Sequence, residues 1–375
     1  MAELIFFGHD AHDPAVQRRI KAFEHAGAVV RAFTMRRGPA FKTPWINIDL
    51  GETKDAAFAQ RMLALMNAAP IVHARRDALR HADLFYARNL DMLALAVWAK
   101  RVSASRAPIV YECLDIHRFM TREDALGGAM RNLERMLLND VKLVVVSSPA
   151  FVREYFDQRH PGRVRAMLIE NRLPWGFEYG PRPVEPQARS GPIRIGWYGN
   201  LRCKRSLALL LALADRFPDR IEIVLRGAPA RTELGAFEAD IAERKNVSFG
   251  GRYAWPNDLA SLYADVDLVW AGDFHDPGAN SKWLLPNRIY EGGYYCTPSV
   301  APADSETGRW IDEKGLGFTL AEPLEETLPT FFETLPRDRI LEARGLLAAA
   351  PEETFLQPKN ELKTVIDAAR EEPRP

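Results

Sequence analysis

Short apolar segments alternate with amphipathic stretches along the first half of the chain. Six segments have the length and composition of buried strands: 3–8, 28–33, 83–87, 108–113, 142–148 and 166–171. Between them, apolar residues recur at helical spacing over 14–25, 55–69, 90–103, 123–140 and 149–158. Strands that alternate with helices in this way indicate βαβ units, so we predict a parallel sheet covered by helices.

The pattern stops at a Pro- and Gly-rich stretch and then starts again. Residues 176–192 read as a linker between a first lobe, 1–175, and a second lobe, 193–350. The second lobe repeats the alternation, with strands predicted at 193–199, 221–227, 246–251, 266–272 and 298–302. Its predicted helices are 206–217, 233–244, 257–264, 287–295 and 323–350. We expect a last helix, 359–370 within segment 351–375, to pack back on the first lobe.

Composition narrows the protein class. The 375 residues carry no net charge and have a pI of about 7.1, which argues against nucleic-acid binding driven by bulk charge. The chain has no apolar run of the ~18 residues that span a membrane, and its start lacks the pattern of a signal peptide. Three widely spaced cysteines, Cys113, Cys203 and Cys296, exclude a disulfide framework and favour the cytoplasm.

The zero net charge hides an asymmetry between the two halves. Residues 1–175 carry a net charge of +7, and residues 176–375 carry −7. A basic first lobe fits weak contact with an anionic surface, such as the inner face of a membrane. Ordinary arginine-rich, solvated helices are the alternative explanation.

A cluster of titratable residues follows the first predicted strand: His9, Asp10, His12 and Asp13. Four such side chains within five residues cannot converge on one ion in a single turn, so we predict no metal site there. Asp13 precedes Pro14, which is the pattern of a helix N-cap. The alternative is a general base or a contact for a substrate hydroxyl. We take Asp13 as the first candidate base. We assign His9 and Asp10 to the binding of an acceptor substrate, the one whose hydroxyl such a base would deprotonate.

Of two further acidic motifs, one is a candidate for function and the other is predicted to be structural. Asp115 and His117 follow the strand 108–113 and can bind sugar hydroxyls or perform acid–base chemistry, although a capping turn is the alternative. Asp265 and Asp267 form a DxD motif, which in some glycosyltransferases holds a metal. Here the motif precedes its strand, so we predict a structural role.

The second lobe opens with GWYGNLRCKRS, 196–206, in which Gly199 and Asn200 form a turn before a helix. Three cations stand beside that turn: Arg202, Lys204 and Arg205. Neither GxGxxG nor a P-loop is present, which disfavours a dinucleotide-dependent oxidoreductase. Backbone N–H groups at a helix start, with cations beside them, suit a diphosphate without a metal. A solvated basic turn is the alternative. Arg226 lies in a second Gly-containing turn.

The segment 279–305 carries the most specific pattern. Asn280 and Ser281 precede a turn, and Arg288 and Glu291 fall on one face of the helix that follows. An arginine at a helix N-terminus can bind phosphate, and a glutamate one turn on can accept both ribose hydroxyls. We therefore predict a nucleotide site here.

These motifs, in this order, resemble a family 4-type glycosyltransferase with the GT-B fold. The resemblance covers about 330 residues and is strongest over PNRIYEGGYYCTPSVA, 286–301. The opening, GHDAHDPAVQRRIKAFEHAGAVV, resembles bacterial exopolysaccharide glycosyltransferases of the succinoglycan type. The resemblance implies an α/β protein of two Rossmann-like lobes whose sheets face a central crevice. It also implies transfer of a hexosyl group, without a cofactor, from a UDP-sugar to a saccharide or lipid-linked acceptor.

The resemblance further implies roles for single residues. Arg202 and Lys204 match the cations that grip the donor diphosphate, and Glu291 matches the carboxylate on the ribose. Arg252 and Tyr253 fall where the nucleobase sits, and His117 falls near the first-lobe histidine. The sequence departs from the family at Trp283, where the earlier of two acidic residues is expected.

That departure favours an inverting reaction with Asp13, or else Asp115, as the base. Metal independence is predicted because Arg202, Lys204 and Arg205, and no carboxylate pair, follow a strand of the second lobe. In a retaining reaction, His117 would position the sugar. Two other functions remain open from the sequence: a sugar-nucleotide epimerase on the same fold, and a non-catalytic scaffold that binds nucleotide-sugars.

Overall fold

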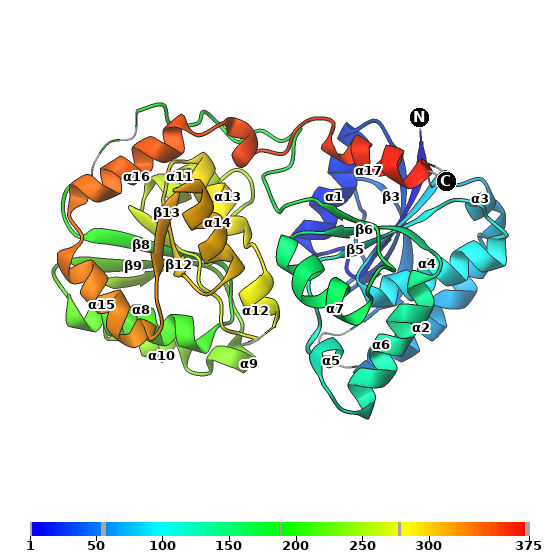
Figure 1. Cartoon of the computed structure of the whole chain (residues 1–375), viewed down its shortest axis with the longest axis horizontal. Helices are drawn as coiled ribbons and strands as arrows, with labels where there is room; N and C mark the ends of the chain where they lie inside the picture. Colours follow the sequence, from blue (N-terminus) through cyan, green and yellow to red (C-terminus); the bar gives the residue numbers. More distant parts are fainter. Residues whose placement is uncertain (1, 54–57, 186, 188, 277–278, 372–375) are drawn as a thin grey trace. The chain divides into compact units, whose positions relative to one another are not determined.

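The computed structural model describes residues 2–53, 58–185, 187, 189–276 and 279–371. The chain forms two compact units (Figure 1). The first unit contains the chain up to Glu170, together with Pro174–Gly176 and the segment that begins at Pro358. The second unit contains Asn171–Leu173 and Phe177–Gln357. Each unit is built on its own parallel sheet, as the alternating pattern predicted.

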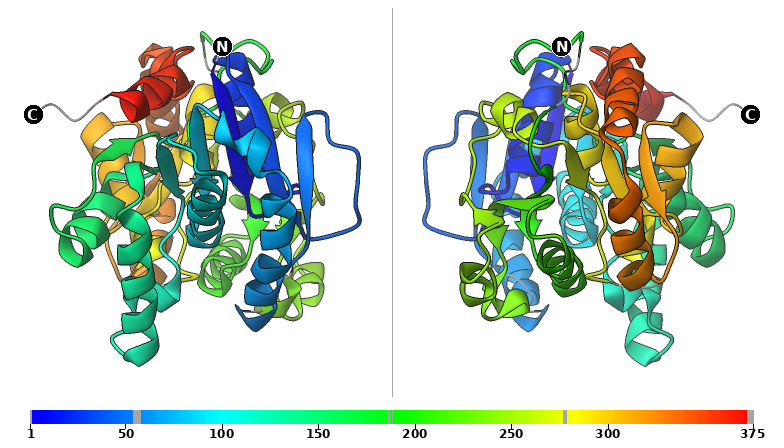
Figure 2. Two further views of the ribbon diagram at one scale, coloured as in Figure 1. Left: turned by 90° about the vertical axis from the view of Figure 1, so that its right-hand side faces the viewer. Right: turned by 90° about the vertical axis from the view of Figure 1, so that its left-hand side faces the viewer.

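The sheet of the first unit has seven strands among the described residues, in the order β3-β2-β1-β4-β5-β6-β7. Their bounds are β1 Glu3–Gly8, β2 Val29–Arg36, β3 Ile46–Glu52, β4 Leu84–Arg88, β5 Ile109–Cys113, β6 Val141–Val146 and β7 Ala166–Leu168. All neighbouring strands pair in parallel. Figure 2 shows β3 at one border of this sheet, after the long loop that leaves β2. The carboxyl ends of β1, β4 and β5 therefore meet along one edge.

Helices cover both faces of this sheet, which explains why its central strands are mostly apolar. One face carries α1 Pro14–His25 and α17 Glu361–Arg370, whose apolar residues share a core with Leu4, Phe6 and Leu84. The opposite layer is formed by α2 Phe58–His73, α3 Arg76–Arg80, α4 Leu90–Ser103 and α6 Ala125–Leu138. Short segments complete the unit: α5 Arg118–Thr121, the π-helical turn η1 Phe151–Phe156 and α7 Asp157–Arg159.

The C-terminal helix α17 belongs to the core of the first unit. Its residues Leu362, Val365 and Ile366 are buried against α1 and β6. Figure 1 shows α17, in red, beside α1, in blue. The last helix of the chain therefore closes the apolar face that the first helix leaves incomplete.

The second unit has a six-stranded parallel sheet, in the order β10-β9-β8-β11-β12-β13, among the described residues. The strands are β8 Ile193–Leu201, β9 Ile221–Pro229, β10 Val247–Phe249, β11 Leu268–Trp270, β12 Ser299–Pro302 and β13 Gly317–Leu320. One face packs against α8 Lys204–Arg216 and α15 Leu324–Thr334. The other face packs against α11 Leu259–Ala264, α13 Asn287–Tyr294, α14 Glu306–Lys314 and α16 Arg337–Ala349. Four short helices complete it: α9 Arg231–Leu234, α10 Phe237–Ala242, α12 Asn280–Trp283 and η2 Glu352–Thr354.

Several predicted elements differ from the observed ones for local reasons. The helix predicted over 233–244 is broken at Gly235, whose φ of +60° ends α9. The helix predicted over 323–350 is interrupted before Pro336, which has no N–H to continue it. Strands β3 and β13 and helix α14 were not predicted. The helix predicted over 55–69 includes residues 55–57, which lie outside the described part of the chain. In the described part, α2 begins at Phe58.

No helix in the described part of the chain is both long and apolar enough to cross a membrane.

Candidate functional site

The first candidate site lies at the carboxyl edge of the first sheet, where β1 and β4 are neighbours. His9 follows β1 directly, and Asn89 follows β4 directly. The two side chains meet, with Nδ1 of His9 lying 3.4 Å from Nδ2 of Asn89. The sequence analysis missed Asn89. Its position immediately after an apolar strand was the available signal.

His9 also contacts Asp13, four residues along the chain. Its Nε2 lies 3.0 Å from Oδ2 of Asp13, while Oδ1 of Asp13 accepts a hydrogen bond from the Ala15 backbone N–H at 2.8 Å. Burial by itself raises the pKa of Asp13, but His9, the charge of Arg88 and the Ala15 N–H together hold it well below its usual range. Asp13 therefore caps α1 and binds His9 at the same time.

The remaining residues of the HDAHD motif have separate partners. Oδ1 of Asp10 accepts hydrogen bonds from the backbone N–H groups of His12 and Arg37, each at 3.0 Å. The ring of His12 lies on Phe41, with 4.4 Å between the ring centroids. Across the described residues, no three His, Cys, Asp or Glu side chains converge as a metal site would require.

The other first-unit candidates follow β5. The side chains of Asp115 and His117 are exposed, and His117 caps α5 by accepting the Phe119 N–H at Nδ1, at 3.3 Å. The structure thus joins His9 to Asp13 directly, whereas Asp115 and His117 are exposed after β5, which pairs with β4 and not with β1.

A buried ion-pair network supports this edge, and the sequence analysis did not find it. Glu112 on β5 lies 2.7 Å from Arg19 of α1 and 2.8 Å from Nε of Arg88 on β4. Arg88 in turn donates a hydrogen bond to the Ala15 carbonyl. The network therefore fixes the start of α1, which carries Asp13.

The second candidate site lies at the carboxyl end of the second sheet. Strands β8 and β9 approach closely there, and a Cβ on Gly227 would lie 1.9 Å from the Gly199 carbonyl oxygen, so only glycine fits. Nη1 of Arg288, at the start of α13, donates to the Tyr198 carbonyl at 3.0 Å. The predicted cation Arg288 is thus held beside Gly199 and Asn200, which were predicted to form a turn but lie within β8.

Asp273 connects several of the predicted donor residues, although the sequence analysis missed it. Its Oδ1 accepts from the Ser281 hydroxyl at 2.8 Å and from the His275 N–H at 2.9 Å, and its Oδ2 lies 3.7 Å from Arg202. Burial raises the pKa of Asp273, but these hydrogen bonds and the charges of Arg202 and Arg288 lower it overall. Asp273 is half-buried; it binds Ser281 directly, and the charges of Arg202 and Arg288 both act on its carboxylate. The position of Asp273 just after the apolar strand 268–270 was the available signal in the sequence.

Arg205, which the sequence analysis assigned to the donor diphosphate, is paired with two carboxylates in this structure. Its guanidinium makes two hydrogen bonds to each of Glu322 and Glu325, at 2.7 to 3.0 Å, and stacks on the ring of Phe274. Its neighbour Lys204 is exposed at the first position of α8. The helix start therefore offers one arginine and one lysine, and the second arginine is already paired.

The predicted nucleobase residues lie on a loop after β10. Arg226 donates to the carbonyl oxygens of Gly251 and Arg252, at 3.3 and 3.2 Å, and so holds this loop. Arg252 is exposed, and Tyr253 is partly buried at the border of an apolar cluster. Arg226 therefore acts on the loop that carries these two residues.

Glu291 is buried among aromatic side chains. It accepts hydrogen bonds from the Tyr263 hydroxyl at 2.9 Å and from the indole N–H of Trp255 at 3.2 Å. Burial, and then the charge of Glu291, raise the pKa of Tyr263 well above its ordinary value. Of the two other predicted donor residues, Asn200 is exposed after Gly199, and Asn280 is buried at the start of α12.

The DxD motif binds arginines. Asp267 is buried and accepts the Arg194 backbone N–H at 2.9 Å, while Arg337 approaches its other oxygen to 3.4 Å. Asp265 pairs with the side chain of Arg194. These carboxylates lie before β11, at the opposite end of the strand from Asp273.

Comparisons with known proteins agree with this architecture. No family model matches the chain. The chain is 39% identical over 337 residues to the succinoglycan biosynthesis protein ExoL of Rhizobium meliloti. The match covers 88% of this chain and 84% of that protein. Among solved structures, it resembles Anabaena HepE in complex with UDP and glucose, with a TM-score of 0.70, 15% identity and coverage of 98% and 100%. It also resembles WaaG, a glycosyltransferase involved in lipopolysaccharide biosynthesis, with a TM-score of 0.64, 15% identity and coverage of 98% and 100%.

The predicted α/β class and the predicted resemblance are confirmed by these comparisons. The chain belongs to the family of the succinoglycan biosynthesis protein ExoL and has the GT-B fold of glycosyltransferases.

Proposed function

We propose that this protein is a glycosyltransferase of exopolysaccharide synthesis, which moves a hexosyl group from a UDP-sugar to a saccharide or lipid-linked saccharide acceptor. The observation that carries the proposal is the cluster of Arg202, Arg288 and Ser281 around Asp273, at the carboxyl end of a parallel sheet. Such sheet ends are where α/β folds bind their ligands. The family of ExoL and the UDP complex of HepE support the same donor class.

The donor diphosphate is bound by cations and backbone N–H groups. Arg202, Lys204 and Arg288 supply the positive charge. Gly199 and Asn200, near the end of β8, lead to the start of α8, whose first N–H groups lack partners within the helix. We leave Arg205 out of this set, because Glu322 and Glu325 already neutralise it. Ser281 and Asn280 border the same site.

The nucleoside is bound farther along the same sheet edge. A carboxylate offers up to four acceptor positions, so Glu291 can hold Trp255 and Tyr263 and still accept ribose hydroxyls. Arg252 and Tyr253 contact the base, and Arg226 positions their loop. Glu291 is buried, and each of its oxygens already accepts one hydrogen bond from an aromatic side chain.

The acceptor is bound by the first unit. His9, Asp10 and Asp13 lie after β1, and Asp115 and His117 lie after β5, on the same edge of the sheet. Hydroxyl-rich saccharides suit such a mixture of carboxylates and imidazoles. The position of His117 at the start of α5 supports a contact with the transferred sugar.

The reaction proceeds without a metal ion and inverts the anomeric centre. Arginine and lysine side chains stabilise the charge that develops on the leaving diphosphate, as electrostatic catalysis requires. A base on the first unit then accepts the proton of the acceptor hydroxyl. Transfer that survives EDTA supports this mechanism, and loss on chelation with recovery on Mg²⁺ contradicts it.

One assay separates the proposed reaction from the alternatives. The protein is incubated with UDP-glucose, with and without octyl β-D-glucoside as the acceptor probe, and UDP and glycoside products are measured. Release of UDP with a disaccharide product supports transfer. Conversion of UDP-glucose to another UDP-sugar without UDP release indicates an epimerase. Binding of UDP-glucose without any product indicates a scaffold.

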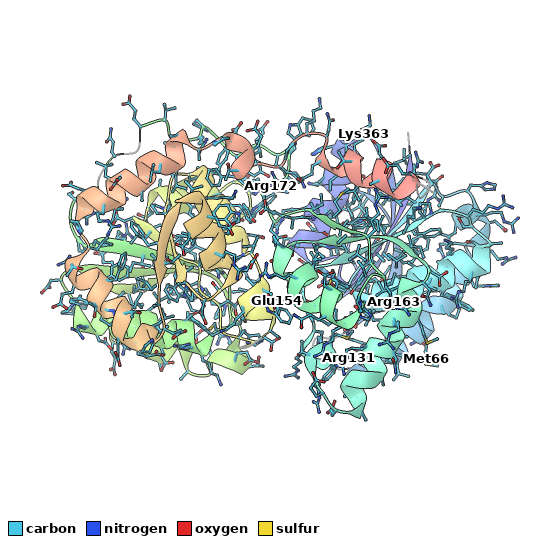
Figure 3. The ribbon with its side chains drawn as sticks, in the orientation of Figure 1. Met66, Arg131, Glu154, Arg163, Arg172 and Lys363 are labelled. Carbon is cyan, nitrogen blue, oxygen red and sulfur yellow. The ribbon has the colours of Figure 1, made fainter. Side chains whose placement is uncertain are left out.

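Weak contact with the inner face of a membrane fits the first unit. Among the described residues, seven large apolar side chains on its helices are exposed, and we call them together the apolar patch: Met62, Leu63, Met66, Trp98, Leu126, Leu133 and Met136. They come from α2, α4 and α6, and α4 contacts both of the other helices. Figure 3 labels Met66 of α2 and Arg131 of α6. Arg101 and Arg135 are exposed on the same helices, and anionic headgroups attract such charges.

A further inference from the structure

We infer that His9, and not Asp13, is the base that deprotonates the acceptor, with Asp13 holding the imidazole and Asn89 binding the acceptor hydroxyl. This inference rests on the proposed function and deepens it at the first-unit site. It gives the HDAHD motif a single reactive atom, Nδ1 of His9.

The two ring nitrogens of His9 face side chains with opposite capacities. Nε2 lies 3.0 Å from a carboxylate oxygen of Asp13, which can only accept a hydrogen bond. A neutral imidazole carries one proton, so that proton sits on Nε2, and Nδ1 keeps its lone pair. The facing atom of Asn89 is its amide nitrogen, a donor, which is consistent with this tautomer.

Asp13 is poorly suited to be the base itself. One of its oxygens caps Ala15, the other contacts His9, and its charged form is stabilised by Arg88. A carboxylate stabilised in this way has little tendency to accept a proton. The same contacts make it a good partner for His9, because it fixes the ring and stabilises the positive charge that the ring acquires.

Asn89 shows two features that packing does not explain. Its backbone has φ +70° and ψ 162°, a region that residues other than glycine enter only under strain. It stands before the first residue of α4 but makes no side-chain capping bond, and its Oδ1 is buried without a hydrogen-bond partner among the described residues. Strain held in a polar residue beside a histidine is typical of a binding position.

We place the acceptor hydroxyl beside the contact of Asn89 with His9, within hydrogen-bond distance of both side chains. The 3.4 Å separation of Nδ2 and Nδ1 is long for a hydrogen bond. The Asn89 amide would then donate to the hydroxyl oxygen, and Nδ1 of His9 would accept from the hydroxyl proton.

The chemical step is balanced without any other reagent. The acceptor oxygen forms a bond to the anomeric carbon as its proton passes to Nδ1 of His9. The bond from that carbon to the diphosphate oxygen breaks, and its electron pair leaves with UDP. The imidazolium, next to Asp13 and within the field of Arg88, then returns its proton to water.

The test compares four variants of the whole chain with UDP-glucose and octyl β-D-glucoside. His9→Gln should lower kcat by ~10²–10⁴-fold and leave UDP affinity unchanged in calorimetry. Added imidazole should restore part of the activity of His9→Ala. Asn89→Gly should raise the KM for the acceptor by about tenfold or more without lowering the Tm, because glycine adopts this backbone freely. His12→Gln is the matched control, since its ring contacts Phe41 in the adjoining loop.

The position of the proton on His9 provides a readout that needs no turnover. Long-range ¹H–¹⁵N NMR should show the proton on Nε2 in the wild type and on Nδ1 in Asp13→Asn. A wild-type proton on Nδ1, or a kcat of His9→Gln equal to that of His12→Gln, would overturn the inference and leave the proposed function intact. A wild-type protein that binds no UDP and transfers no sugar would overturn the proposed function itself.

Discussion

The carboxylate of Glu291 accepts a hydrogen bond of 2.9 Å from the hydroxyl of Tyr263, inside a cluster of aromatic rings. The pair fixes the buried carboxylate of Glu291 at the site proposed for the ribose. It also allows the structural and binding roles of Glu291 to be measured separately.

We predict that Glu291→Gln weakens UDP binding while the protein stays folded. A hydrogen bond to a charged group contributes ~1.5–3 kcal/mol, so the dissociation constant should rise at least about tenfold. Tyr263→Phe is the control, because it removes the interior partner and keeps the carboxylate. It should lower the Tm and leave UDP affinity nearly unchanged. Equal UDP affinity of wild type and folded Glu291→Gln in calorimetry would exclude the ribose contact.

Arg202 and Arg205 form a matched pair on one helix start. Arg202→Gln should weaken UDP binding by about tenfold or more, since a charge-assisted bond to phosphate is lost. Arg205→Gln should change UDP affinity little, because Arg205 is bound to Glu322 and Glu325. As an exposed ion pair, its loss should cost no more than ~1 kcal/mol of stability. If the two variants lose affinity equally, Arg205 leaves its carboxylates when the donor binds.

The capping contacts of Asp13 predict a pH-dependent contribution to stability. The folded pKa of Asp13 lies well below its value in the unfolded chain, ~3.9, so its contribution is fully present above that value. It is lost as the pH falls from ~4 toward the folded pKa. Asp13→Asn keeps the cap but cannot titrate. The difference in unfolding free energy between wild type and Asp13→Asn, measured with urea, should therefore shrink between pH 5 and pH 3. A constant difference would contradict the ionic role.

The apolar patch predicts salt-sensitive adsorption to anionic vesicles. In co-sedimentation at low salt, the protein should bind vesicles that contain phosphatidylglycerol more than neutral ones, and salt should reduce that binding. Replacing Met66 and Met136, each 67% exposed, by serine should lower adsorption without affecting UDP affinity. Leu346→Ser, an exposed apolar position of the second unit, is the control. Equal binding to both kinds of vesicle would reject the membrane contact.

Much of the fold could be predicted because buried parallel strands have a simple signature. The runs ending at Gly8 and Val146 are apolar on both faces, and each precedes a polar loop. Edge strands carry less signal: β3, INIDLGE, pairs on one side only and alternates weakly. Breaks within helices escaped prediction for another reason. A single Gly235 or Pro336 decides them, and the surrounding periodicity continues through the break.

The candidate sites were predictable only as far as strand ends. The positions of His9, Arg202 and Glu291 follow from their place after a strand or at a helix start. Their partners depend on which strands are neighbours, which the sequence order does not reveal. Asn89 meets His9 because β4 lies beside β1, 80 residues away in the chain. Arg205 looked equivalent to Arg202 until Glu322 and Glu325, more than 100 residues away, were found to bind it.

Helix α17 is buried against α1 and β6 in one apolar core. During synthesis, α1 is made early and α17 late, so this core stays incomplete while the second unit is translated. A ribosome must translate the entire second unit before the first unit can bury Val16, Ile20 and Phe23 completely. A chain released before Glu361 would carry that apolar surface uncovered, which is a signal that chaperones and proteases recognise. A stable first unit thus requires translation to proceed through α17, and products truncated before this helix are marked for removal.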